Sequence, residues 1–300
     1  MILVAGGTGR LGSELVRRLS ADGTAVRVLT RSAAAAARLR ERGVEVVVGD
    51  LRDSVAVTRA VEGCAAVVAA MTGFGPGRGD PRSVDLDGTR ALVAAARTAG
   101  VPHMVLLSVS GAAADAPIPL FRSKAAAEAV LRGSGLPWTI IRPTAYLETY
   151  VDIVGAPIAA RGGRAQVFGA GRMPIDFVSV QDVAALVLRA LHDRDLRGRV
   201  LELGGETRTM TALAHALAAD AGVTTEPRHV PRTALRMMSV AAKPFSPFLA
   251  RVAQAALVMD TVDLRPPAPD ARRAVPGLPV TTLADVLAAR RGSAAPLPSA

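Results

Sequence analysis

The chain has 300 residues, of which 50% are hydrophobic and 21% are charged, so it can bury a large core and is not a disordered, collagen-like or coiled-coil protein. Its 36 Lys and Arg residues exceed its 26 Asp and Glu residues, which gives a net charge of +10, but only 3% of residues are aromatic, which argues against base stacking on nucleic acid. The single Cys64 excludes an internal disulfide, no apolar run is long enough to cross a membrane, and no signal peptide is recognisable, so we expect a cytoplasmic protein.

Short apolar segments alternate with amphipathic segments through the first half of the chain. Strands that are apolar on both faces and alternate with helices are typical of a parallel sheet covered on two sides. We therefore expect an α/β protein with a doubly wound parallel sheet, that is, a Rossmann fold. The expected strands are 2–5, 25–30, 44–48, 65–71, 104–108, 138–141 and 200–203, and the expected helices include 33–42, 88–99, 123–132 and 180–191.

The alternation loosens after Pro143, where Gly155, Pro157 and several further glycines predict loops. Later segments have helical patterns over 212–221 and 234–259, the second interrupted by prolines. The sequence thus predicts a Rossmann domain and a smaller, mostly helical substrate lobe. The expected boundaries are 1–150 for the Rossmann domain with 177–203 returning to it, 151–176 and 204–290 for the substrate lobe, and 291–300 for a flexible tail.

A glycine cluster follows the first expected strand and opens a helix. Gly7, Gly9 and Gly12 have the spacing Gly-x-Gly-x-x-Gly. Such glycines permit a tight turn and let backbone N–H groups approach a pyrophosphate, which the helix N-terminus attracts. The context of strand, loop and helix is the one that a dinucleotide-binding loop requires. The expected cofactor loop comprises Gly6, Gly7, Thr8, Gly9, Arg10, Leu11 and Gly12.

The end of the second expected strand bears on the choice between NAD and NADP. An acidic residue there binds the ribose hydroxyls of NAD, whereas an arginine receives the 2′-phosphate of NADP. The residue at this point is Arg31, so we expect NADP(H), while NAD(H) stays open because Arg31 is one of 34 arginines. Asp50 and Leu51 are expected to border the adenine, and Met71 and Thr72 to line the cofactor.

Seven blocks of the sequence carry a family resemblance. They are 6–12, 49–51, 84–89, 107–110, Lys124 with Glu128, 135–143, and 177–184. Together they resemble the atypical short-chain dehydrogenase/reductase superfamily, specifically its NmrA-like, NAD(P)H-binding members. In that superfamily a tyrosine four residues before the lysine is the usual proton donor, and Leu120 stands at its place here. NmrA-like reductases share this loss, so the resemblance implies that Lys124 binds the nicotinamide ribose and can act as acid or base.

Three further side chains are catalytic candidates. Ser108 and Ser110 end the fifth expected strand, at the edge where such sheets bind ligands, and one of them is expected to bind substrate or nicotinamide. Pro143 and Tyr146 lie in the segment that borders the nicotinamide in relatives, and Tyr146 could replace the missing proton donor or simply pack in the core. We expect no metal site, because the four histidines lack cysteine or carboxylate partners at ligand spacing.

Two functions remain open from the sequence. The resemblance implies NADPH-dependent reduction of an apolar carbonyl, quinone or enone, and the alternative is a non-catalytic NADP(H)-sensing regulator that binds a partner protein. Segment 227–259 contains no acidic residue and mixes basic with apolar residues, which fits either a surface for a partner, membrane or nucleic acid, or a helical cover over the substrate. We favour the cover, and therefore expect a small apolar substrate and no membrane or nucleic-acid partner, with a homodimer or a regulatory protein left open.

Overall fold

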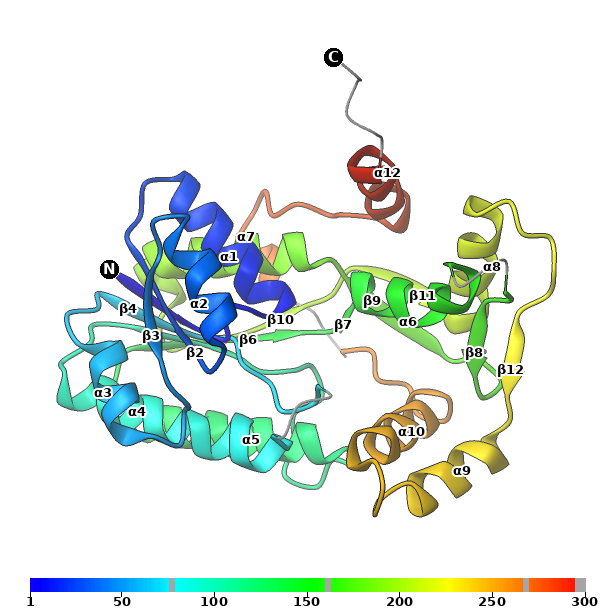
Figure 1. The fold of residues 1–300 in the computed structure, drawn as a ribbon, viewed down its shortest axis with the longest axis horizontal. Coiled ribbons are helices and arrows are strands. Elements are labelled where there is room, and N and C mark those ends of the chain that lie inside the picture. The colour runs from blue at the N-terminus through cyan, green and yellow to red at the C-terminus, as the bar shows by residue number, and fades with distance from the viewer. Residues whose placement is uncertain (76–78, 160–162, 267–269, 295–300) are drawn as a thin grey trace. The chain divides into compact units, whose positions relative to one another are not determined.

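The computed structural model of the chain describes residues 1–75, 79–159, 163–266 and 270–294 (Figure 1). The contacts between Cα atoms divide the chain into two units, each with its own core. Unit 1 comprises Met1–Pro143, Val183–Leu203 and Ala268–Leu278, and unit 2 comprises Thr144–Asp182, Gly204–Pro267 and Pro279–Ala300.

Unit 1 is built on a seven-stranded sheet in which every pair of neighbouring strands is parallel. The strand order is β10-β6-β5-β4-β1-β2-β3, so the chain proceeds outward from β1 in one direction and from β4 in the other. The expected doubly wound fold is confirmed. The strands are β1 (Ile2–Ala5), β2 (Val26–Thr30), β3 (Glu45–Val48), β4 (Ala66–Ala69), β5 (Met104–Leu107), β6 (Trp138–Pro143) and β10 (Val200–Leu203).

Helices cover both faces of this sheet: α1, α2 and α7 lie on one face and α3, α4 and α5 on the other (Figure 1). Helix α5 begins at Pro119, four residues before the expected start, because the fixed φ of proline suits the first turn of a helix. Asp53 caps α3 by accepting from the N–H groups of Val55 and Ala56. The elements are α1 (Arg10–Ala21), α2 (Ala33–Arg40), α3 (Ser54–Val61), the π-helix η1 (Arg82–Asp87), α4 (Gly88–Thr98), α5 (Pro119–Arg132), α7 (Val180–His192), the 3-10 helix η2 (Arg194–Leu196) and α11 (Ala271–Ala274).

Unit 2 combines helices with two small sheets, of order β11-β9-β7 and β12-β8. The loops expected at Gly155 and Pro157 are wrong, because both residues lie inside α6. Leu147, Val151 and Val154 recur at helical spacing and are buried in the core of unit 2, and this burial outweighs the local preference of glycine and proline. The elements are β7 (Ala145–Tyr146), α6 (Leu147–Ala159), β8 (Gln166–Phe168), β9 (Pro174–Val178), β11 (Glu206–Thr209), α8 (Met210–Asp220), β12 (Arg228–Val230), α9 (Arg232–Ala241), α10 (Pro247–Met259) and α12 (Leu283–Ala294).

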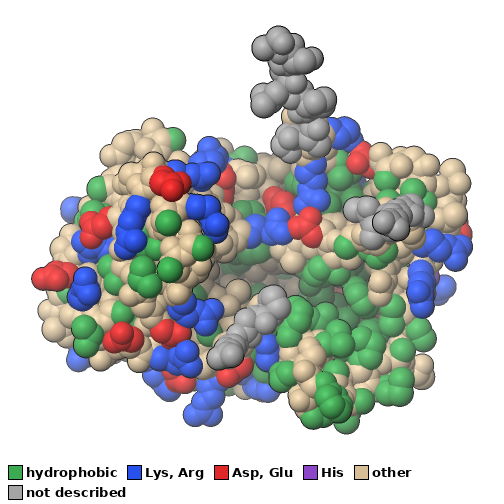
Figure 2. Space-filling view, viewed as in Figure 1, with side chains coloured by type: hydrophobic (Ala, Val, Ile, Leu, Met, Phe, Trp, Pro, Cys, Tyr) green, Lys and Arg blue, Asp and Glu red, His purple; other side chains and the backbone are tan. Residues whose placement is uncertain are grey.

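The segment expected as helix over 234–259 forms two helices, α9 and α10, joined by the turn at residues 242–246. Hydrophobic side chains gather on the surface over these two helices (Figure 2). The C-terminal helix α12 includes residues 291–294 of the expected tail, and residues 295–300 of it lie outside the described part of the chain. Within the described ranges, no helix is both long and apolar enough to cross a membrane.

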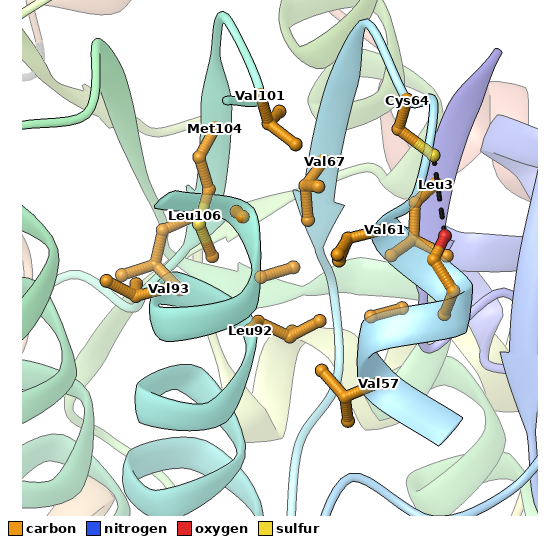
Figure 3. Close-up of a cluster of buried hydrophobic side chains, with 14 of the residues drawn as sticks. Leu3, Val57, Val61, Cys64, Val67, Leu92, Val93, Val101, Met104 and Leu106 are labelled. Atoms are coloured by element: carbon orange, nitrogen blue, oxygen red, sulfur yellow. Dashed lines mark hydrogen bonds between the residues drawn. The ribbon is translucent and has the colours of Figure 1, made fainter. Parts of the chain in front are cut away.

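The core of unit 1 fills the space between the sheet and the helices α3 and α4 (Figure 3). Strand residues such as Leu3, Met104 and Leu106 meet Leu92 of α4 there, all of them inaccessible to solvent. Cys64 lies at the border of this cluster, and its thiol donates to the carbonyl oxygen of Ala60 at 3.4 Å. Burial raises the pKa of the Cys64 thiol, so this cysteine acts as a small buried hydrophobe and not as a nucleophile.

Candidate functional site

The glycine loop joins β1 to α1 at the carboxyl edge of the sheet. Strands β1 and β4 are neighbours at the point where the strand order reverses, which is where sheets of this kind bind ligands. Gly6 has a φ of +90°, and a Cβ at this position would lie only 2.7 Å from the carbonyl carbon of Ala70. A Cβ at Gly12 would overlap the carbonyl oxygen of Gly6. The packing of the protein itself therefore requires glycine at both positions.

Gly9 is less crowded than Gly6 and Gly12, because only one heavy atom outside its chain neighbours would lie within 4 Å of a Cβ there. The closest heavy atom to a Cβ at Gly9 would be the Gly6 oxygen at 3.3 Å, and the residue is exposed. Gly9 is the N-cap residue of α1, whose first-turn N–H groups have no acceptor within the helix and whose first turn contains no acidic residue. Exposed backbone N–H groups at a helix N-terminus, with no side chain over them, suit the pyrophosphate of a dinucleotide.

The other residues of the loop divide between surface and core. Thr8 and Arg10 are exposed beside Gly9, where they can contact a bound phosphate group. Leu11 is buried and packs inward with α1, so its contribution is to the fold of the loop. The backbone of Gly7 faces Val28 of β2, with no space for a side chain between them.

Two arginines flank Asp50 at the end of β3. Arg52 binds the Asp50 carboxylate through two hydrogen bonds of 2.9 Å, and Arg31, at the end of β2, lies 3.8 Å from it. The hydrogen bond from Arg52 is the main reason that the pKa of Asp50 is lowered to about 2. Arg31 keeps 58% of its side chain exposed, so it is available to an anion. Leu51 is half-buried and packs against Gly88.

Lys124 of α5 is buried, and three acceptors surround its ammonium group. Nζ donates to the carbonyl oxygens of Leu107 at 2.7 Å and Met71 at 3.1 Å, and it lies 2.9 Å from Oδ1 of Asp85. The other carboxylate oxygen of Asp85 accepts from the N–H of Gly73 at 2.8 Å. Lys124 therefore holds the residues that follow β4 and the end of β5 against the π-helix η1.

Sequence reasoning missed the role of Asp85. The residue falls within the block 84–89, and the one available signal was an acidic residue just before the helix expected at 88–99. Its pairing with Lys124 joins positions that are 39 apart in the sequence, and no local pattern reveals such a pair. Of the two residues expected to line the cofactor after β4, Met71 is buried and Thr72 is exposed.

Ser108 belongs to a network of charged groups around Glu128 of α5. Its hydroxyl donates to Glu128 at 2.5 Å, and the same carboxylate receives two hydrogen bonds of 2.7 Å from Arg142 and one of 2.8 Å from Arg132. Two charge-assisted bonds to one carboxylate fix both partners in place. Because the hydroxyl of Ser108 is engaged with Glu128, this serine is a structural partner of α5 in the arrangement seen here.

Ser110 stands on the other side of Arg142, beside Glu202 of β10. The N–H of Ser110 donates to the carbonyl oxygen of Pro143 at 2.9 Å, and Arg142 reaches Glu202 at 3.1 Å. Burial raises the pKa of Glu202, although hydrogen bonds from Arg142 and Ser110 act against this rise. The structure thus brings Ser110, Pro143 and Glu202 together at the carboxyl edge of β5, β6 and β10, and sequence reasoning did not single out Glu202.

Tyr146 lies in unit 2, where it forms part of β7 and pairs with Val178 of β9. Burial raises the pKa of its phenol, and the nearby Glu148 raises it further. A phenol that holds its proton more tightly than usual is a weaker acid, which makes Tyr146 poorly suited to donate a proton.

Histidine and acidic side chains do not gather into a metal site. In the described ranges, no group of three or more His, Cys, Asp or Glu side chains has the geometry to hold an ion. His103 is buried, its Nε2 lies 3.1 Å from the hydroxyl of Thr139, and burial lowers its pKa to about 4. This histidine is a neutral part of the core.

Comparison with known proteins adds to this geometry. Residues 6–194 match a protein family described as NAD(P)H-binding. The chain belongs to this family. The match contains the glycine loop, Arg31, Lys124 and Ser110, so the candidate cofactor site lies inside the region that defines the family.

Two curated proteins of known role resemble this chain over about two thirds of its length. An NAD(P)H azoreductase from Xenophilus azovorans is 34% identical over 191 residues, which are 64% of this chain and 63% of the azoreductase. A photosystem II assembly factor, Ycf39 from Trieres chinensis, is 29% identical over 205 residues, 68% of this chain and 64% of that protein. The matched region therefore covers less than two thirds of either relative.

Solved structures show the same fold. The complex of an NADPH-dependent quinone oxidoreductase from Escherichia coli with NADPH superposes with a TM-score of 0.76 at 23% identity. The match covers 97% of this chain and 100% of that one. At this identity the likeness concerns the fold, and it agrees with the atypical short-chain dehydrogenase/reductase class that the sequence blocks resemble.

Proposed function

We propose that the protein is an NADPH-dependent reductase of a small apolar acceptor. The observation that carries this proposal is the exposed backbone of Gly9 at the N-terminus of α1. A Cβ there would meet one loop oxygen at 3.3 Å, whereas a Cβ at Gly6 or Gly12 would overlap the protein's own backbone. Bound NADPH supplies a hydride. The family match and the reductase name of the azoreductase relative support the assignment.

The preference for NADPH rests on Arg31 and Arg52. Both guanidinium groups are largely exposed beside Asp50, with 58% and 69% of their side chains accessible. The acid that would recognise the ribose of NAD is absent from the end of β2, and the carboxylate at the end of β3 is already bound by Arg52. Two cations at this edge favour a ribose that carries a phosphate.

The class of acceptor follows from the missing proton donor. Leu120 stands where the superfamily has its tyrosine, and the pKa of Tyr146 is raised by burial, so neither side chain supplies a proton readily. An acceptor whose reduced form is a stabilised anion, such as a quinone or an enone, can take a hydride without a strong acid, whereas a simple ketone cannot. We therefore favour a quinone or an enone, with the Ser110 hydroxyl turning from Glu202 to donate a hydrogen bond to the oxygen that gains charge.

Lys124 has a positioning role in this proposal. Its ammonium group donates to two backbone carbonyl oxygens and forms an ion pair with the Asp85 carboxylate, so a substrate that binds Nζ must displace one of these buried contacts. By fixing the Met71 and Leu107 carbonyl groups, Lys124 keeps the ends of two strands in register at the edge where the nicotinamide is expected. Proton donation by Lys124 would require the loss of a buried contact, so we assign proton transfer to solvent.

Stopped-flow absorbance at the nicotinamide band tests the reductase. Purified protein with NADPH should oxidise the cofactor when a small quinone or enone is added, and should leave it unchanged with an aliphatic ketone of similar size. The variant Ser110→Ala should slow this step about tenfold to a hundredfold, whereas Val55→Ala, an exposed change on α3, should not. Tight binding of NADPH without oxidation by any acceptor would contradict a reductase.

A second function is a non-catalytic NADP(H) sensor that binds a partner protein. The observation that favours it is the engagement of the polar side chains at the sheet edge, since Lys124 and Ser108 both have buried protein partners. The resemblance to a photosystem II assembly factor also supports a role other than catalysis in this family. Under this alternative the stopped-flow trace stays flat, and NADPH changes the affinity of the protein for a partner.

A further inference from the structure

The helix pair α9–α10 (Arg232–Met259) carries a cluster of exposed apolar side chains. Phe245, in the turn between the helices, is 89% exposed, and Met237 and Val240 of α9 are 66% and 67% exposed. Hydrophobic side chains cover much of the surface over these helices (Figure 2). We call Met237, Val240 and Phe245 the apolar tip.

The apolar tip is not needed to hold the two helices together. Leu235 of α9 and Ala250 and Ala253 of α10 are buried and supply the inner faces of the pair. The base of α9 is anchored in unit 2, because Arg232 binds the buried Asp260 at 2.5 Å and Asp260 accepts from the N–H of Gly171 at 2.8 Å. The tip is thus an exposed end of a pair whose base is fixed.

Positive charge accompanies the apolar tip. No acidic residue occurs between Pro227 and Met259. Arg236 and Lys243 flank the tip on either side of Val240, and both are exposed. Neither side chain has an ion-pair partner in the part of the chain that the structure describes, in contrast to Arg232. An apolar tip flanked by cations is complementary to a surface with an anionic outer layer over an apolar interior.

We propose that the apolar tip inserts into the surface of an anionic membrane, with Arg236 and Lys243 contacting lipid phosphate groups. A side chain as exposed as Phe245 projects into solvent and does not line a groove, so it suits a deformable interface better than a preformed partner. A second copy of the chain docking through the same face would bring the cations of both copies together. Docking on a membrane goes beyond the reductase function, and it replaces our sequence-based preference for a cover over the substrate.

Vesicle flotation tests this proposal with the full chain. The protein should float with vesicles of phosphatidylcholine and phosphatidylglycerol and should remain at the bottom with phosphatidylcholine alone. Phe245→Asp should lower the partition coefficient by at least about tenfold, because burying one aromatic side chain contributes that much or more. Arg236→Gln with Lys243→Gln should lower it roughly thirtyfold, and 0.5 M salt should have a similar effect.

Matched variants separate the tip from general effects. Val55→Asp changes another exposed apolar residue, on α3, and Arg59→Gln with Arg97→Gln removes the same charge from unit 1, so both should bind vesicles as the parent does. Equal flotation with neutral vesicles, or unchanged flotation of Phe245→Asp, would overturn the proposal. The proposal would also be overturned if the protein did not float and instead formed a dimer in sedimentation velocity that Phe245→Asp abolishes. The same holds if it did not float and instead bound an acidic amphipathic peptide through Phe245.

Discussion

The ion pair between Lys124 and Asp85 permits a direct measurement of what burial does to a charge pair. Its N–O distance is 2.9 Å, and the two side chains are 5% and 0% exposed. A few residues away, Arg90 and Asp87 form a pair with the same distance of 2.9 Å, but these side chains are 54% and 46% exposed. The two pairs have equal separation in one region of unit 1, so they differ mainly in their access to water.

Removal of one member of the buried pair leaves the other charge without compensation in the core. Asp85→Asn or Lys124→Met should each lower the free energy of unfolding of unit 1 by about 3–5 kcal/mol. The double variant should lose much less than the sum, because it buries no charge, and the resulting coupling energy should be about 3 kcal/mol. The matched cycle on Arg90 and Asp87 should give about 0.5 kcal/mol, since water screens an exposed pair.

Urea unfolding followed by tryptophan fluorescence measures these values. The single tryptophan of the chain, Trp138, lies in β6, so its signal reports on unit 1 and is not confused by unit 2. The four proteins of each cycle should be compared at neutral pH and with equal slopes of free energy against urea. A coupling energy for Lys124 and Asp85 no larger than that of the exposed pair would refute the structural role that we assign to Lys124.

Three further predictions concern the cofactor site and its surroundings. Arg31→Glu should raise the dissociation constant of NADPH about tenfold to a hundredfold and that of NADH far less, as measured by isothermal titration. The control Arg38→Glu on α2 should leave both constants unchanged. An equal loss of affinity for NADPH and NADH would show that Arg31 does not bind the 2′-phosphate. Gly9→Ala should lose little stability but bind NADPH at least about tenfold more weakly, because its Cβ would lie 3.3 Å from the Gly6 oxygen. Gly12→Ala should lower the free energy of unfolding by about 1–3 kcal/mol or more, because its Cβ would overlap that oxygen; the reverse order would contradict our assignment of Gly9 to the cofactor. Glu202 has a raised pKa, so the stability that it contributes is complete below its ordinary pKa of 4.5 and is lost as the pH rises through the raised value. The free energy of unfolding of Glu202→Gln, relative to that of the parent, should therefore increase from pH 4 to pH 7. A constant difference would show that this carboxyl group does not titrate with a shifted pKa.

The sequence was sufficient for the architecture of unit 1. Its strands are short runs that are apolar on both faces, and its helices have one apolar face, so the pattern itself states which residues must be buried. The positions of the strands agree with the structure within a few residues, as in β2, which begins at Val26 where 25 was expected. The glycine loop was equally readable, because its function depends on the spacing of a few adjacent residues.

Local rules failed in unit 2, where burial overrides them. Gly155 and Pro157 predict a break, yet α6 continues through both because Leu147, Val151 and Val154 gain more from a shared core than the helix loses. The identity of the partners at the sheet edge was also beyond local rules. The contacts of Lys124 with Asp85, and of Arg142 with Glu202, join positions 39 and 60 residues apart.

By itself, the sequence determined the doubly wound sheet, the glycine loop and the charged residue at the end of β2, since each depends on neighbours along the chain. Only the tertiary structure decided that Lys124 is held by three buried acceptors, that Ser108 turns toward Glu128 whereas Ser110 lies beside Glu202, and that Phe245 remains in water. These outcomes depend on which distant residues exclude water from a side chain. Burial is a property of the packed chain, and the same lysine or phenylalanine acquires a different role when it is enclosed or exposed.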